Sequence, residues 1–183
     1  MQIKVGLKEN KEPAIIDSQC LKMLITGTTA SGKSHFTINN IIEPLIKSGQ
    51  TVVLFDSKWI DYTKFKDKCF VFEDSDILTK LKFPDGSYLI VDELACLLID
   101  QDAKEAFLKL LTSKTVSVIA TEAHPDLLDD SIKRQFRYKL GFTTMSSKES
   151  EDAIGYDGCE KLLMQDEALF VQGTSKPEKI FIE

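Results

Sequence analysis

A glycine-rich stretch near the start of the chain holds the residue types that bind phosphate groups. From Gly27 to Ser34 it has the pattern G-x-x-x-x-G-K-S. In such a loop the backbone N–H groups point inward, the lysine adds a positive charge and the serine hydroxyl can bind Mg²⁺. We expect Lys33 to contact the β- and γ-phosphates of a nucleoside triphosphate and Ser34 to contact Mg²⁺. The predicted phosphate-binding residues are Gly27, Thr28, Thr29, Ala30, Ser31, Gly32, Lys33, Ser34 and His35.

A pair of acids ends an apolar segment farther along the chain. This segment, SYLIVDE, runs from Ser87 to Glu93. We expect Asp92 to hold Mg²⁺ through water, and Glu93, one residue closer to the γ-phosphate, to polarise the attacking water. Acids also mark where any buried strand leaves a core. The phosphate loop upstream favours the metal and water site over that alternative.

A lysine follows a third apolar segment. Asp56-Ser-Lys58 ends a predicted strand at the same edge of the sheet as the two acids. Lys58 is either a solvated turn lysine or a member of the site, and the residues alone leave both interpretations open.

The elements on either side of the phosphate loop are those that such a loop requires. Leu21–Thr26 predicts a short buried strand before it, and the apolar spacing after Lys33 predicts a helix that ends at Gly49. The positive end of that helix dipole would face the phosphates. Pro44 lies inside the helix, so we expect a kink there or a division into two pieces.

Strands and helical segments alternate along the rest of the chain, which predicts an α/β fold with a mostly parallel sheet covered by helices on both faces. We expect a single domain over residues 1–183, with a small β-hairpin extension at 1–20 and a core at 21–183. Ligands bind at the carboxyl ends of the strands in such sheets. The predicted strands are Gln2–Leu7 and Pro13–Ile16 in the hairpin, then Leu21–Thr26, Thr51–Asp56, Phe70–Phe72, Ser87–Asp92, Val116–Thr121 and Tyr138–Phe142, and a closing antiparallel pair at Ala168–Gln172 and Lys179–Ile182; the later helices lie near 103–111, Asp130–Phe136 and Lys148–Ile154.

Composition excludes several classes of protein. Hydrophobic residues make up 43% and charged residues 28% of the 183 residues, as in folded globular proteins. The net charge of −6 argues against a broad cationic surface for nucleic acid, although a local basic ring inside an assembly is compatible with it. Four scattered cysteines and two histidines argue against a structural zinc site or a disulfide framework. Since no apolar run approaches the about 18 residues of a membrane span, we expect a cytoplasmic protein with no direct membrane insertion.

Several short motifs, in order, resemble those of the FtsK/SpoIIIE DNA translocases, which belong to the HerA–FtsK class of P-loop ATPases. GTTASGKS is similar to the phosphate loop of that family, VVLFDSK to its strand ending in D-P-K, and IVDELACLL to its V-D-E-L-A-D-L-M segment. VIATEAHPD resembles its A-T-Q-R-P segment, and GCEKLL its G-A-E-K-L-L segment. The similarity extends from about residue 5 to the C-terminus. Several motifs in register are more specific than any one of them.

The resemblance implies a RecA-like motor domain that binds ATP and Mg²⁺. Such domains assemble into a ring, usually a hexamer, and use ATP hydrolysis to move double-stranded DNA, and a protein partner can recruit them. By this resemblance Lys33 is also catalytic, and Thr121 lies on the strand that senses the γ-phosphate. The short chain fits the compact motors of viruses, plasmids or other mobile elements.

Three departures from the family pattern stand out. Glu122 replaces the glutamine that follows the threonine, and Ala123 replaces the next arginine. A charged Glu122 would be repelled by a γ-phosphate unless it is protonated or turned away. Ala30 replaces a glycine of the phosphate loop, so the loop must tolerate a Cβ at that position.

Arginine is scarce in this chain, although ring ATPases usually take an arginine from the neighbouring subunit to stabilise the transition state. Arg134 and Arg137 are the only arginines in the sequence. We therefore expect one of three outcomes. Arg134 or Arg137 acts on a neighbouring copy, a lysine such as Lys109 or Lys114 substitutes, or the protein hydrolyses ATP slowly.

Two other functions fit the same motifs. Type VII secretion ATPases, which export proteins, carry the same kind of domain, and the net charge of −6 favours this alternative mildly. The other is a slow, nucleotide-gated assembly module, which Glu122 and the scarcity of arginine favour.

Overall fold

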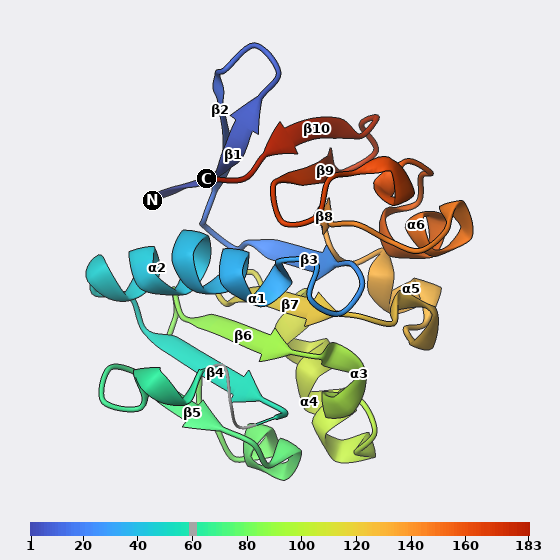
Figure 1. Cartoon of the computed structure of the whole chain (residues 1–183). Helices are drawn as coiled ribbons and strands as arrows, with labels where there is room; N and C mark the ends of the chain where they lie inside the picture. The colour runs from blue at the N-terminus through green and yellow to red at the C-terminus, as the bar shows by residue number, and fades with distance from the viewer. Residues whose placement is uncertain (59–61) are drawn as a thin grey trace.

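The structure, a computed structural model, describes residues 1–58 and 62–183. Within these residues ten strands form one sheet in the order β2-β1-β10-β9-β8-β3-β7-β6-β4-β5 (Figure 1). The six strands from β8 to β5 run parallel, and the other four pair antiparallel. The predicted α/β class is therefore confirmed. The strands are β1 (Gln2–Lys8), β2 (Pro13–Asp17), β3 (Lys22–Thr26), β4 (Val52–Asp56), β5 (Phe70–Phe72), β6 (Tyr88–Asp92), β7 (Ser117–Glu122), β8 (Tyr138–Gly141), β9 (Glu167–Gln172) and β10 (Glu178–Phe181).

Helices cover both faces of the parallel strands. Strands β3, β4, β6 and β7 are buried along their whole length, which explains their continuous apolar runs. Side chains alternate between two cores along β3, where Met23 and Ile25 pack toward α1 and α2, and Leu24 packs toward α3 and α4. The helices are α1 (Lys33–Phe36), α2 (Glu43–Lys47), α3 (Leu94–Leu97), α4 (Gln101–Thr112), α5 (Asp130–Lys133) and α6 (Ser147–Ile154), with short 3₁₀ turns at Thr63–Phe65, Ser75–Thr79, Pro125–Leu127 and Cys159–Lys161.

The helix after the phosphate loop contains a π-helical segment. This segment, Thr37–Ile42, joins α1 to α2 without a break. Pro44 lies in the first turn of α2, directly after the segment. Proline donates no N–H, and its ring crowds the carbonyl four residues earlier in an α-helix, so a wider preceding turn accommodates it. The helix ends as predicted before Gly49, which has φ +74°.

The opposite face carries the predicted helix near 103–111. This helix, α4, begins where the Asp100 side chain accepts a hydrogen bond from the Ala103 N–H at 2.7 Å. Ala103, Phe107 and Leu111 are buried against the sheet. The prediction for Asp130–Phe136 was partly wrong, because α5 ends at Lys133 and the chain then turns to enter β8. The four-residue helix α3 was not predicted, since one turn is too short to show a periodicity.

The antiparallel strands extend the same sheet. Strand β8 pairs with β9, β9 with β10, and β10 with β1. Strands β1 and β2 pair antiparallel and project from the sheet at the top of Figure 1. The two ends of the chain therefore lie close together, and Lys4 forms an ion pair with Glu183.

The structure also bears on the four cysteines and on the length of the helices. Cys20, Cys69, Cys96 and Cys159 all carry free thiols. Among residues 1–58 and 62–183, every helix is too short or too polar to cross a bilayer.

Candidate active site

The phosphate loop and the predicted acids meet at the carboxyl edge of the parallel strands. The phosphate loop leaves β3 after Thr26, which lies beside Glu122 at the end of β7. In the same way Asp56 at the end of β4 lies beside Asp92 at the end of β6. Parallel pairing thus brings segments that are distant in the sequence to one edge of the sheet.

The phosphate loop is anchored by its backbone. The Thr28 N–H donates a hydrogen bond to the Thr143 carbonyl oxygen at 2.9 Å. Gly27 has φ +143°, and a Cβ there would lie 2.8 Å from the Cβ of Phe142, so this position requires glycine. Ala30 is exposed and adopts φ +64°, a left-handed conformation that costs about 1 kcal/mol for a residue with a Cβ. The loop therefore tolerates alanine at position 30, as expected, with some backbone strain.

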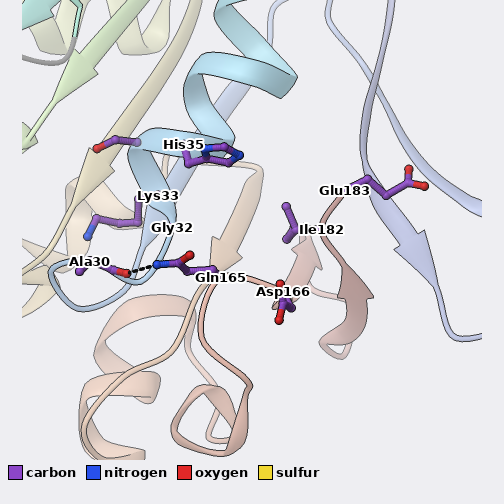
Figure 2. Close-up of a pocket in the computed structure, with 9 residues that line it drawn as sticks. Ala30, Gly32, Lys33, His35, Gln165, Asp166, Ile182 and Glu183 are labelled. Atoms are coloured by element: carbon purple, nitrogen blue, oxygen red, sulfur yellow. Dashed lines mark hydrogen bonds between the residues drawn. The ribbon is translucent and has the colours of Figure 1, made fainter.

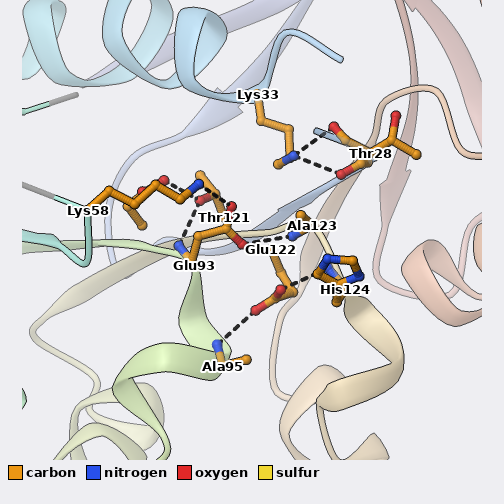
Figure 3. A network of polar contacts seen from close by, with 11 residues as sticks. Thr28, Lys33, Lys58, Glu93, Ala95, Thr121, Glu122, Ala123 and His124 are labelled. Atoms are coloured by element: carbon orange, nitrogen blue, oxygen red, sulfur yellow. Dashed lines mark hydrogen bonds and ion pairs between the residues drawn. The ribbon is translucent and has the colours of Figure 1, made fainter. Parts of the chain in front are cut away.

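The Lys33 ammonium lies across the loop. Its Nζ donates hydrogen bonds to the carbonyl oxygens of Gly27 at 2.7 Å and Thr28 at 2.9 Å (Figure 3). Burial lowers the pKa of Lys33, and the negative charges of Glu93 and Asp92 oppose that shift. Phosphate oxygens are stronger acceptors for an ammonium group than neutral carbonyls. A bound phosphate would therefore compete effectively for this lysine.

The oxygen atoms near the loop fit a magnesium nucleotide. Asp92 is 2% exposed, and one of its carboxylate oxygens accepts a hydrogen bond from the Thr121 hydroxyl at 2.9 Å. Ser34 lies half-buried at the start of α1. The Ser31 hydroxyl is buried inside the loop and has no hydrogen-bond partner among the described residues. Carboxylate and hydroxyl oxygens are the ligands that Mg²⁺ prefers, so this donor set fits Mg²⁺.

Thr121 joins the two acids. Its hydroxyl accepts a hydrogen bond from the Glu93 N–H at 3.1 Å and donates one to the Asp92 carboxylate. Glu93 has φ +53°, an uncommon backbone conformation for a residue with a side chain. Thr121 therefore holds the Asp92 carboxylate and the Glu93 backbone in place where the chain leaves β6.

The Glu93 carboxylate has a partner on each oxygen. One oxygen accepts a hydrogen bond from Lys58 Nζ at 3.1 Å, and the other accepts one from the Ala123 N–H at 3.1 Å. Burial by itself would raise the pKa of Glu93, but the contacts with Lys58 and Ala123 and the charge of Lys33 lower it. Glu93 is therefore ionised at neutral pH, as a group that accepts a proton from water must be. Lys58 contacts Glu93 in this cluster, so it is a member of the site and not only a solvated turn lysine.

Glu122 is turned away from the phosphate loop. Its two carboxylate oxygens accept hydrogen bonds from the backbone N–H groups of Ala95 and His124, both at 2.8 Å (Figure 3). Burial raises the pKa of Glu122, and these two amides oppose the shift. The structure therefore shows Glu122 turned toward the backbone, and burial and the neighbouring Glu93 raise its pKa.

The two arginines do not meet this site within the chain. Arg137 directly precedes Tyr138, which pairs with Met23 near the start of β3. Arg137 therefore lies at the end of the sheet opposite the phosphate loop, and Arg134 lies at the end of α5. Both side chains are exposed.

A cavity of about 440 Å³ lies on the other side of the phosphate loop from the acids. Figure 2 shows residues of the loop facing the C-terminal part of the chain. Gln165 donates a hydrogen bond from its Nε2 to the Ala30 carbonyl oxygen at 3.3 Å. Nothing in the sequence pattern indicates Gln165, because only the fold brings it to the loop. The cavity is lined by Ala30, Gly32, Lys33, Ser34, His35, Gln165, Asp166, Ile182 and Glu183.

The chain is similar to known proteins in structure but not in sequence. No family model and no curated protein matches the sequence. Among solved structures, the pCW3 conjugation coupling protein TcpA with ATPγS superposes with a TM-score of 0.84 at 17% identity, over 99% of this chain and 65% of that one. The chain has the fold of an FtsK/SpoIIIE-type ATPase domain.

Two further structures show how widely this fold is used. The chain superposes on the type VII secretion ATPase EccC of Thermomonospora curvata with a TM-score of 0.79 at 15% identity, over 99% of this chain and 28% of EccC. It superposes on the genome packaging NTPase B204 of Sulfolobus turreted icosahedral virus 2, in complex with ATPγS, with a TM-score of 0.66 at 16% identity, over 90% of this chain and 98% of B204. The chain thus spans less than two thirds of TcpA and EccC, and most of B204.

Proposed function

We propose that this FtsK/SpoIIIE-type domain hydrolyses ATP and, as a ring of its own copies, uses that energy to move double-stranded DNA. One observation carries the ATPase assignment. Lys33, Asp92 and Glu93, which come from two distant sequence motifs, lie at the same carboxyl edge of the sheet, because β3 and β6 both run parallel to β7. A ring of six copies is the expected assembly.

Each residue of the site has a role in this proposal. Lys33 and the loop amides hold the β- and γ-phosphates, and Ser34 and Asp92 hold Mg²⁺. When bound, Mg²⁺ neutralises charge on the phosphate oxygens. Glu93 accepts a proton from water as the water oxygen attacks the γ-phosphorus, and the bond from that phosphorus to ADP breaks. Thr121 holds Glu93 in position for this proton transfer.

The cavity beside the loop is the proposed place for the nucleoside. It opens next to Lys33 and Ser34, so phosphates on the loop would place the sugar and base there. The exposed His35 ring offers a surface on which a base can stack.

DNA is the proposed cargo because the ordered motifs resemble those of DNA translocases. TcpA is a conjugation coupling protein and B204 is a genome packaging NTPase, which also favours DNA. In a ring, the exposed Arg134 or Arg137 would act on the nucleotide of a neighbouring copy.

ATP turnover by the purified protein, with and without linear duplex DNA over a range of salt concentrations, tests this proposal. DNA should stimulate turnover, and the stimulation should fade as salt rises, because contacts to DNA phosphates release counterions. The Glu93→Gln protein is the control for contaminating ATPases. Absence of both stimulation and DNA retention at low salt would overturn the assignment of DNA as cargo.

Protein export is the second candidate function. The superposition on EccC covers 99% of the chain, and the net charge is −6. ATP turnover that ignores DNA and rises with an exported polypeptide would favour this function. Very slow turnover under every condition would instead favour a nucleotide-gated assembly module.

A further inference from the structure

The contact between Lys58 and Glu93 joins the ends of two neighbouring parallel strands. Lys58 Nζ lies 3.1 Å from a Glu93 carboxylate oxygen (Figure 3). Asp56 and Asp92 lie side by side in the β4–β6 pairing, so the segments that follow them leave the sheet together. The sheet register therefore places the lysine at the acid proposed to polarise water.

The two side chains of this ion pair differ in how freely they can move. The Glu93 side chain is 14% exposed, its backbone N–H donates to Thr121, and its second oxygen accepts from the Ala123 N–H. The Lys58 side chain is 51% exposed. A lysine on a flexible four-carbon stem can redirect its ammonium group without moving the backbone. Lys58 is therefore the partner that can leave, while Glu93 keeps its place.

A phosphate held by the loop would compete with Glu93 for this lysine. Lys33 and Lys58 are close enough to repel each other, and both are attracted to Glu93. A triphosphate bound at Lys33 brings negative charge between the two ammonium groups and relieves that repulsion. Diphosphate would lack the terminal group that lies nearest the acids.

We propose that Lys58 is a positioning residue that pairs with Glu93 before nucleotide binds and exchanges Glu93 for the γ-phosphate when a triphosphate is bound. This inference rests on the proposed ATPase function. The exchange frees one Glu93 oxygen to accept the proton of the attacking water and places a positive charge on the phosphate. Lys58 would thus supply, from within the same chain, positive charge that ring ATPases usually take from a neighbouring arginine, in a sequence that has only two arginines.

The test measures binding of fluorescent ADP and ATPγS, together with ATP turnover, for Lys58→Met, Lys58→Arg and the control Lys80→Met. Lys80 forms a comparable but exposed ion pair with Asp76 at 2.7 Å, outside the cluster. Lys58→Met should weaken ATPγS binding about tenfold, leave ADP binding within about twofold and lower kcat by on the order of tenfold. Lys58→Arg should retain most of each property, and Lys80→Met should match the unaltered protein.

The same measurements in a Glu93→Gln background separate exchange from a purely structural ion pair. With the carboxylate gone, Lys58 no longer has to leave Glu93, so Lys58→Met should weaken ATPγS binding more than it does in the unaltered protein. Equal losses for ADP and ATPγS, or a Lys58→Met protein that behaves like Lys80→Met, would overturn the exchange but leave the ATPase proposal standing. Failure of the unaltered protein to bind ATPγS would overturn both.

Discussion

The two halves of the candidate site are built in different ways. The phosphate loop is one continuous segment, and Lys33 is held by carbonyl oxygens of that same loop, Gly27 and Thr28. The acid half combines residues from the ends of three strands, β4, β6 and β7. Its contacts, such as Thr121 with Asp92, join residues that are far apart in the sequence.

Because of this difference, we expect substitutions in the two halves to affect different steps. Changes in the loop should act mainly on nucleotide binding, because the loop contacts phosphate directly. Changes in the acid half should act on turnover, and they should also affect neighbouring residues because each acid shares its partners with others. The following variants test this division, from the largest expected effect to the smallest.

Lys33→Ala should abolish nucleotide binding and with it all turnover. The variant removes the only loop ammonium, and we expect triphosphate affinity to fall by more than about a hundredfold. Equilibrium binding of a fluorescent triphosphate measures the loss. Lys47→Ala is the matched control, since Lys47 forms an exposed ion pair with Glu43 on α2. Retained affinity in Lys33→Ala would contradict the assignment of the loop.

Glu93→Gln should leave triphosphate binding intact and lower turnover by about a thousandfold, because an amide cannot accept the proton of the attacking water. Single-turnover hydrolysis, measured beside equilibrium binding, separates the two effects. Equal hydrolysis by this variant and the unaltered protein would remove the role assigned to Glu93.

Thr121→Val should lower turnover by roughly tenfold and the free energy of unfolding by about 1–2 kcal/mol. The variant keeps the shape of the side chain but loses the hydroxyl that bonds both Asp92 and the Glu93 N–H. Denaturant unfolding and steady-state kinetics measure the two losses. Thr121→Ser, which restores the hydroxyl, should recover most of the turnover, and a failure to do so would contradict the bridging role.

Glu122→Gln should destabilise the fold by about 1 kcal/mol although it restores the residue of the resembled family. Each Glu122 oxygen accepts a backbone N–H, whereas a glutamine would turn its NH₂ group toward one of those donors. Triphosphate affinity should stay within about twofold. Tighter triphosphate binding in this variant would indicate that Glu122 faces the γ-phosphate after all.

The predictions from sequence succeeded where the signal is local. Apolar runs that end in acids identified β4 and β6, and the spacing of Ala103, Phe107 and Leu111 identified α4. They failed where the length of an element depends on its surroundings. α5 ends early because the chain must turn into β8, and the π-helical segment before Pro44 was not predicted.

The sequence by itself determined the phosphate loop and the two acids, because each lies within a short segment whose chemistry is set by neighbouring residues. The tertiary structure decided what surrounds them. Lys58 meets Glu93, Glu122 turns to the amides of Ala95 and His124, and Gln165 reaches the loop only through strand register and packing. Contacts between distant residues depend on which strands pair and where each one ends, and no short stretch of sequence contains that information.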